Sequence, residues 1–123
     1  MLSGDYMKTN LPSEIIYGFS NRKDGNLSFK WATDKQEALE NRRGFLEKLG
    51  LNLEDCVCMS ILDSDQVVEV GKGTKGAGML DISQAVKADA IITKESGVGL
   101  LLLTGDCLPI VLFDSVKKVH ALA

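Results

Sequence analysis

The chain has 123 residues, 45% of them hydrophobic and 25% charged, a composition typical of a folded domain that excludes extended disorder. Its formal net charge is −3, so we expect neither nucleic acid nor an anionic membrane surface as a partner. Its longest apolar stretch is far shorter than the ~20 residues that a membrane-spanning helix needs. The chain has three cysteines, and residues 1–10 show no secretory signal. Both observations favour reduced thiols and a cytoplasmic location.

The first part of the chain is predicted to contain one strand and one long helix. Residues 15–19 are β-forming and predict a strand. A helix is predicted over residues 34–49, with Thr33 or Asp34 as its N-cap and Gly50 as its C-terminal stop. Its core face is formed by residues at helical spacing: Ala38, Phe45, Leu46 and Leu49.

The rest of the chain is predicted to be rich in strands. In residues 56–62, Val57 and Met59 alternate with Cys56 and Cys58, as they would on the two faces of a strand. Further strands are predicted at residues 67–70, 91–92, 98–103, 110–113 and 119–123, whereas residues 85–90 are too short a stretch to assign. This order predicts a mixed α/β (α+β) fold of β-sheet layers flanked by helices, in a single domain over residues 1–123.

The final segment, residues 118–123, has the pattern of a strand without a Gly, Pro or polar stop. Natural C-termini usually fray through polar residues, so we expect the domain to be incomplete at its C-terminus, as the first half of a larger domain. A naturally split or degenerate product is the alternative. In a half domain, strands 98–103 and 119–123 would leave an apolar face open, which predicts self-association.

A glycine-rich segment, residues 71–76, matches the pattern G-x-G-x-x-G and follows a predicted strand. In dinucleotide-binding proteins such a turn opens a helix, whose first amides meet the pyrophosphate. Here Ala77 and a further glycine, Gly78, follow, which makes an immediate helix unfavourable. The sequence therefore favours a mobile surface loop over a nucleotide site.

The segment Thr104–Pro109 interrupts two apolar runs with an acid and a thiol side by side, Asp106 and Cys107. Pro109 lacks an amide proton, so the chain must turn there or run at a sheet edge. A metal or a substrate could reach a thiol presented at such a break. The alternative is that Cys107 is a small buried hydrophobic residue, as most free cysteines are.

Four segments together give a resemblance to a known family. They are residues 88–93 (Ala-Asp-Ala-Ile-Ile-Thr), 104–109 (Thr-Gly-Asp-Cys-Leu-Pro), 17–22 (Tyr-Gly-Phe-Ser-Asn-Arg) and 41–43 (Asn-Arg-Arg). In this order the chain resembles the laccase-domain family (multicopper polyphenol oxidoreductase or YfiH-like), many of whose members are purine nucleoside phosphorylases. Tyr17 stands where the family has His, and Gly105 where it has Ala.

The resemblance implies a transition metal, zinc or copper, held by two His residues and the Cys that matches Cys107. Asp63 stands at the position of the first His and is expected to ligate through oxygen, so Cys107 and Asp63 are the candidate catalytic and metal-binding residues. The second His would follow Ala123, and His120 lies four residues before that position. We therefore expect an incomplete set of metal ligands in this chain.

Two further residues have alternative interpretations. Arg22 matches an arginine near the family's active site and is a candidate to bind phosphate through its guanidinium fork, although it could equally be a solvated turn residue. Asp106 could orient a ligand or cap a strand end. A Cys₃His zinc site from Cys56, Cys58, Cys107 and His120 is disfavoured, because C-x-C on a strand is not the usual chelating spacing.

The resemblance implies an enzyme that cleaves purine nucleosides with phosphate, through a metal held by Cys107, with adenosine deamination as a second activity. Nucleoside and phosphate are then its expected partners. The changes at Tyr17 and Asp63 favour a different hypothesis, a degenerate, metal-free family member that serves as a binding or structural module.

Overall fold

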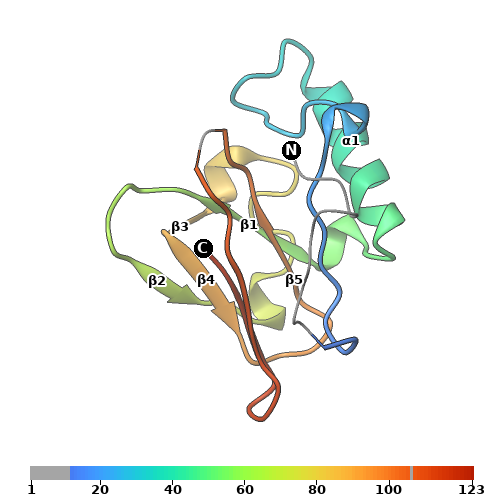
Figure 1. Cartoon of the computed structure of the whole chain (residues 1–123). Coiled ribbons are helices and arrows are strands. Elements are labelled where there is room, and N and C mark those ends of the chain that lie inside the picture. The colour runs from blue at the N-terminus through green and yellow to red at the C-terminus, as the bar shows by residue number, and fades with distance from the viewer. Residues whose placement is uncertain (1–11, 106) are drawn as a thin grey trace.

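The computed structural model of the protein describes residues 12–105 and 107–123 (Figure 1). Its α-helix, α1 (Lys35–Lys48), matches the prediction to within one residue at each end. The Asp34 carboxylate accepts the amide of Gln36 at 2.9 Å and so caps the helix. Gly50 follows the helix with a φ of +73°, a conformation that side chains disfavour, and the chain leaves the helical path there.

The strands form two sheets. Sheet A is entirely parallel and has the order β3 (Val86–Lys87), β1 (Cys56–Ser60), β5 (Gly99–Leu102). Sheet B has the order β2 (Val67–Glu69), β4 (Ala90–Thr93), β7 (Val119–Leu122), β6 (Val111–Asp114). In sheet B, β2 and β4 are parallel, whereas β7 is antiparallel to both of its neighbours. The predicted mixed α+β fold is confirmed.

The chain alternates between the two sheets from β1 to β6, so that odd-numbered strands lie in sheet A and even-numbered strands in sheet B. Strand β2 does not return beside β1 but crosses to pair with β4, so residues 61–66 connect the two sheets and do not form a hairpin. The β6–β7 connection is the hairpin that the pairing shows among the described strands.

The predicted strand at residues 15–19 is wrong. This segment joins neither sheet within the described residues. Its β-forming side chains pack instead of pairing: a Cβ at Gly18 would lie 2.7 Å from Cδ2 of Leu49, so the segment sits directly against the end of α1. The β preference of such residues reflects packing more than a backbone ladder, and here only the packing occurs.

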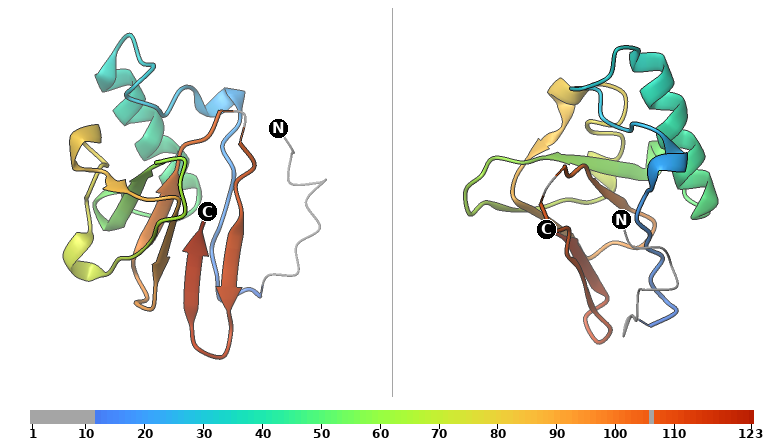
Figure 2. Two further views of the ribbon diagram at one scale, coloured as in Figure 1. Left: turned by 90° about the vertical axis from the view of Figure 1, so that its left-hand side faces the viewer. Right: turned by 45° about the horizontal axis from the view of Figure 1, so that its top comes forward.

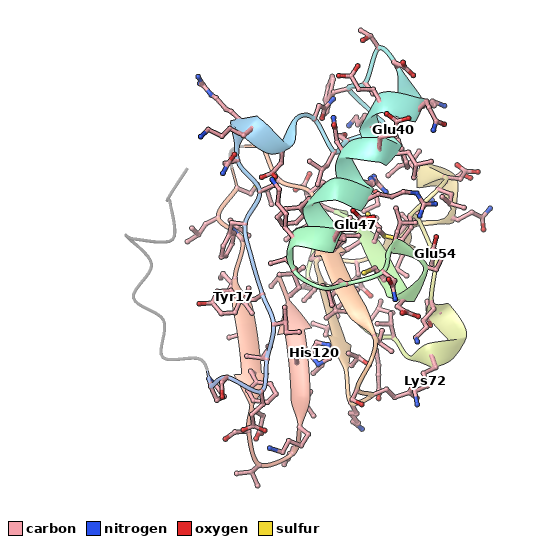
Figure 3. The ribbon with its side chains drawn as sticks, turned by 90° about the vertical axis from the view of Figure 1, so that its right-hand side faces the viewer. Tyr17, Glu40, Glu47, Glu54, Lys72 and His120 are labelled. Carbon is pink, nitrogen blue, oxygen red and sulfur yellow. The ribbon has the colours of Figure 1, made fainter. Side chains whose placement is uncertain are left out.

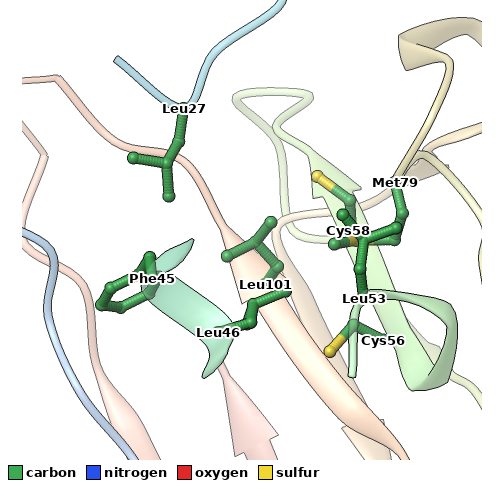
Figure 4. Close-up of a cluster of buried hydrophobic side chains, with 8 residues drawn as sticks. All are labelled: Leu27, Phe45, Leu46, Leu53, Cys56, Cys58, Met79 and Leu101. Atoms are coloured by element: carbon green, nitrogen blue, oxygen red, sulfur yellow. The ribbon is translucent and has the colours of Figure 1, made fainter. Parts of the chain in front are cut away.

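Strand β1 separates two hydrophobic clusters. Its Cys56 and Cys58 belong to the α1-side cluster, between α1 and sheet A; Figure 4 shows its members Leu27, Phe45, Leu46, Leu53, Cys56, Cys58, Met79 and Leu101. Its Val57 and Met59 belong to the inter-sheet cluster, whose buried members are Val57, Met59, Val70, Ala88, Ile91 and Val98. The predicted alternation along this strand is confirmed, and both of its faces are buried, as is typical of a central parallel strand.

The outer face of sheet B is open in the described part of the chain. The register places Leu112 beside Ala121, and Ala121 beside Ile92, on the face opposite the inter-sheet cluster. Leu112 is 55% exposed and Val67 66% exposed. Helix α1 lies on the far side of sheet A and leaves this face uncovered (Figures 1 and 2). None of the helices in the described ranges combines the length and hydropathy needed to cross a bilayer.

Candidate functional site

A cleft of about 1270 Å³ lies beside β5 and is lined by members of both hydrophobic clusters. Residues 14–20 form one wall, β5 and the loop after it a second, and the β6–β7 hairpin a third. The C-terminal end of α1 contributes Leu49. The lining is mainly apolar but also includes charged and polar residues, among them Glu14, Asp55 and Lys118, and a mixed lining of this kind can hold a small molecule.

Aromatic side chains of the N-terminal segment line this cleft. Tyr17 and Phe19 pack edge to face with their ring centroids 6.5 Å apart. Because Gly18 between them is pressed against Leu49, the backbone that carries both rings is fixed in position. An aromatic pair of this kind offers a surface on which a flat heterocycle can pack.

His120 also lines the cleft, from β7 (Figure 3). Its Nε2 lies 2.9 Å from the carbonyl oxygen of Val98, which can only accept, so Nε2 carries the proton and donates. This bond ties β7 to the start of β5 and occupies the ring nitrogen. His120 therefore lines the wall of the cleft with its Nε2 engaged by Val98.

Cys107 lies on the cleft, in the loop between β5 and β6, and its side chain is exposed. The alternative prediction of a small buried residue is therefore wrong for Cys107, although it holds for Cys56 and Cys58. Pro109 lies two residues before β6, which is an edge strand of sheet B, a position compatible with its missing amide proton. Asp106 lies outside the described residues.

Asp63 lies away from this cleft, in the loop between β1 and β2. It is exposed and has a φ of +58°, which is uncommon for a residue with a side chain. Asp89 accepts bonds from the amides of Leu62, Ser64 and Gln66 and so holds the loop on both sides of Asp63. The Asp63 carboxylate has no hydrogen-bond partner among the described residues.

Arg22 lies in a short 3₁₀ helix, Arg22–Asp24, at the end of the segment that lines the cleft. Asn21 caps this turn by accepting the amide of Lys23 at 2.8 Å, and the Asp24 carboxylate accepts the amide of Asn21. Lys48 lies beside Asp24 and holds the pKa of that carboxyl below its usual range. The turn is thus rigidly built, while the Arg22 side chain is exposed and does not line the cleft.

The described residues do not form a metal site. Within residues 12–105 and 107–123, no three His, Cys, Asp or Glu side chains come together in a group that could hold an ion. The Cys107 thiol lines the cleft, whereas Asp63 lies on a different loop that does not. The donors present in these ranges therefore do not fit a complete zinc or copper centre.

The other two thiols are buried and unreactive. Burial raises the pKa of Cys56 to about 11, with the nearby Asp55 carboxylate contributing in the same direction. Burial also raises the pKa of Cys58, against the opposing effect of the Arg42 guanidinium. Both remain neutral thiols at physiological pH, which excludes them as nucleophiles or ready metal ligands.

The glycine-rich segment forms a short 3₁₀ helix, Lys72–Thr74, joined to β1 by a 2.8 Å bond from the amide of Gly76 to the carbonyl of Cys56. The Glu95 carboxylate accepts the amide of Lys72 at 2.6 Å. An acid thus occupies the amide that would face a phosphate in a dinucleotide site, and its charge would repel that phosphate. That the segment is a mobile surface loop rather than a nucleotide site stays a prediction.

Sequence reasoning missed Arg42, which is fully buried on α1. Its guanidinium donates to the carbonyls of Leu27, Gly78 and Met79 at 2.7, 2.8 and 3.0 Å. The guanidinium carbon also lies 3.8 Å from the centre of the Phe29 ring. Arg42 therefore joins three separate segments. The available signal was its spacing, since it lies one helical turn after Ala38 and before Leu46 on the core face.

A family model described as "Multi-copper polyphenol oxidoreductase laccase" matches residues 14–123. Among curated proteins, "Purine nucleoside phosphorylase YlmD" of Geobacillus stearothermophilus is 34% identical over 86 residues, which make up 69% of this chain and 31% of the relative. The protein of the same name from Bacillus subtilis is 29% identical over 131 residues, covering 97% of this chain and 47% of the relative.

The solved structure of YlmD from Geobacillus stearothermophilus has the same fold, with a TM-score of 0.76 and 31% identity. The match covers 80% of this chain and 37% of that one. This chain thus spans between about a third and a half of the length of these relatives. The described sheets and cleft correspond to one portion of a longer relative.

Proposed function

Because the chain belongs to the multi-copper polyphenol oxidoreductase laccase family, we propose that it forms part of a purine nucleoside phosphorylase. The observation that carries the proposal is the similarity to relatives named for that activity, over 69% of this chain in one case and 97% in the other. In phosphorolysis, an oxygen of inorganic phosphate bonds to C1′ of the ribose as the bond from C1′ to the base nitrogen breaks. The base leaves with a proton, and ribose 1-phosphate remains.

The cleft supports a nucleoside as the substrate. Its lining is mainly apolar and includes the edge-to-face pair Tyr17 and Phe19, on which a purine ring can pack. Tyr17 stands where the family has His, so this chain presents a larger aromatic surface at that position. The open wall around Cys107 gives the reacting groups access to solvent.

Arg22 is proposed to bind the phosphate. It is an exposed guanidinium, held beside the cleft-lining segment by a capped turn, and a guanidinium fork matches phosphate oxygens in pairs. Arg22→Gln should raise KM for phosphate roughly tenfold with little change in KM for the nucleoside. Lys23→Gln is the matched control, since it removes the same charge from the same turn. Equal effects of the two substitutions would contradict a specific role for Arg22.

Cys107 and Asp63 are proposed as the contributions of this chain to a zinc or copper centre that is completed by donors outside the described residues. Bound metal would supply Lewis-acid chemistry, with adenosine deamination as a second activity. By itself, this chain should bind well under one equivalent of zinc, measured by elemental analysis after gel filtration. Stoichiometric, tightly bound zinc would contradict the assignment.

The experiment that tests the activity uses a version of the protein that includes the region its relatives have beyond the matched segment. Release of free base from inosine and adenosine is followed by chromatography, with and without phosphate. We expect phosphate-dependent cleavage that Cys107→Ser abolishes, because that change replaces a soft ligand with a poor one. Asp63→His should increase both bound zinc and rate if residue 63 is a ligand.

The second candidate is a metal-free binding or structural module. It is favoured by the position of Asp63 away from the cleft and by the lack of a donor cluster in residues 12–105 and 107–123. Under this hypothesis Asp63→His changes neither metal content nor rate, and no base is released. An active Cys107→Ser protein would overturn the site assignment of the first candidate.

A further inference from the structure

Asp89 occupies the point where two connections between the sheets meet. It lies between β3 of sheet A and β4 of sheet B. The loop of residues 61–66, which we call the crossover loop, makes the same passage from β1 to β2. The amide of Asp89 donates to the carbonyl of Gln66 at 2.8 Å, so the two connections are also joined through their backbones.

The carboxylate of Asp89 accepts four hydrogen bonds, all from the crossover loop. Oδ1 accepts the amides of Leu62 at 3.2 Å and Ser64 at 3.1 Å. Oδ2 accepts the hydroxyl of Ser64 at 2.7 Å and the amide of Gln66 at 3.1 Å. Both oxygens are thus fully used, and the Ser64 hydroxyl bond in particular holds the pKa of Asp89 below its usual range.

The hydrogen bonds that Asp89 accepts lie on both sides of Asp63, whose own side chain takes no part in them. The amides on either side of it, those of Leu62 and Ser64, both donate to Oδ1 of Asp89. Residue 63 itself has a φ of +58°, a conformation that persists where the surroundings fix it. Its own side chain is left exposed and takes no part in the hydrogen bonds of the described loop.

We propose that Asp89 is a positioning residue, which fixes the backbone at residue 63 and so directs that side chain. The proposal deepens the proposed function, in which residue 63 is a ligand, and rests on it for its catalytic consequence. The amides on both sides of residue 63 share one oxygen of Asp89, so loss of that carboxylate should release the backbone on both sides of the residue at once. Each carboxylate oxygen of Asp89 accepts two hydrogen bonds, and together they hold the loop without using the side chain of residue 63.

The loop geometry is tested by amide hydrogen exchange, measured by NMR on this chain. Asp89→Ala should accelerate the exchange of the Leu62, Ser64 and Gln66 amides at least tenfold, relative to amides of β4. The matched control is Asp114→Ala. Asp114 holds the β6–β7 turn in the same way, by accepting the amides of Val116 and Lys117, so its loss should leave the crossover loop unchanged. Unchanged exchange in Asp89→Ala would overturn the proposal.

The direction of side chain 63 is tested with a nitroxide spin label. The label is attached to Asp63→Cys in a Cys107→Ser background, because the other two thiols are buried. We expect an immobilised label with Asp89 and a mobile label with Asp89→Ala, while Asp114→Ala leaves the spectrum unchanged. A label of equal mobility in all three proteins would overturn the proposal, whether or not the protein is a phosphorylase.

The catalytic consequence is tested by a double-mutant cycle on kcat for phosphorolysis. Asp89→Ala should lower kcat at least tenfold, Asp89→Asn less, and neither should lower kcat further once Asp63→Ala is present. Independent effects at the two positions would show that Asp89 acts apart from residue 63 and would overturn the proposal. A wild-type protein without phosphorolysis would overturn the proposed function instead, and the spin label then decides the role of Asp89.

Discussion

The two sides of this molecule differ in how completely their side chains are buried. On the α1 side, helix and sheet A enclose a buried cluster, and even the charged Arg42 is fully buried with three carbonyl partners. On the other side, sheet B presents Leu112 and Val67 to solvent, and the β6–β7 hairpin borders an open cleft. Packing and hydrogen bonds within this chain stabilise the α1 side. The sheet B side instead exposes apolar surface of the kind that marks interaction sites.

The molecule thus divides into a stabilising side and an interacting side. Function is proposed at the cleft and its neighbouring loops, where exposed groups such as Cys107 lie. Substitutions on the α1 side should therefore act on stability, and substitutions on the sheet B side on association and reactivity. Four predictions test this division.

The largest effect is expected at Arg42. Arg42→Ala leaves the carbonyls of Leu27, Gly78 and Met79 without their donor and should lower the free energy of unfolding by about 4 kcal/mol. Arg43→Ala is the control, because Arg43 pairs with Glu54 at the exposed surface and its loss should cost under ~1 kcal/mol. Urea denaturation measures both, and equal losses would remove the distinction between the buried and the exposed arginine.

The second-largest effect is expected in the rates at which the three thiols are chemically modified. Cys107 is exposed, whereas Cys56 and Cys58 are 1% and 0% exposed, so iodoacetamide at pH 8 should modify one thiol in the folded chain. The buried pair should react roughly a thousandfold more slowly, since opening of the stable side must come first. Mass spectrometry counts the adducts, with three expected in urea. Rapid modification of all three thiols without denaturant would show that the α1 side opens as readily as the cleft.

Stability should also depend on pH through Cys56. Its pKa is raised from 9.0 unfolded to about 11 folded, so its contribution is fully present below pH 9 and is lost as pH rises towards 11. Unfolding titrations should show a decrease of up to about 2 kcal/mol across that window. Cys56→Ala should reduce this decrease at the cost of a small cavity, and the raised pKa of Cys58 should account for what remains.

The smallest effect is expected on the outer face of sheet B. The chain should self-associate through this face, and Leu112→Lys should weaken association roughly tenfold without lowering the unfolding free energy. Sedimentation equilibrium over a range of concentrations measures the change, with Lys117→Ala in the neighbouring turn as a control. A wild-type chain that stays monomeric and melts cooperatively at every concentration would contradict an interacting side altogether.

Local patterns in the sequence were sufficient to predict the helix and most strands. The cap at Asp34 and the alternation through Val57 and Cys58 are determined within a few residues, and both are confirmed. The strand predicted at residues 15–19 was wrong because β-forming side chains can pack without pairing. Which sheet a strand joins depends on distant partners, and for that reason the crossing of β2 to β4 was not predicted.

The candidate site was predicted in part. The break in the apolar pattern correctly marked Cys107 as accessible, and the structure brings it to a cleft. Roles for Asp63 and Arg22 remain predictions, since neither lines that cleft. Arg42 and Asp89 were missed because a charged residue in a sequence suggests solvent. Their partners are carbonyls 15, 36 and 37 residues away in one case and amides 23 to 27 residues away in the other.

The alternation of strands between the sheets has a consequence for how the chain folds. Helix α1 and the β6–β7 hairpin can each form from neighbouring residues, but β1 must find β5, and β2 must find β4, across intervening strands of the other sheet. The entropy cost of closing these loops must therefore be met before most of the stabilising contacts between strands can form. This predicts folding in milliseconds to seconds rather than microseconds. The β6–β7 hairpin of sheet B can form early, whereas we expect the remaining pairings of the two sheets to form together in a slower step.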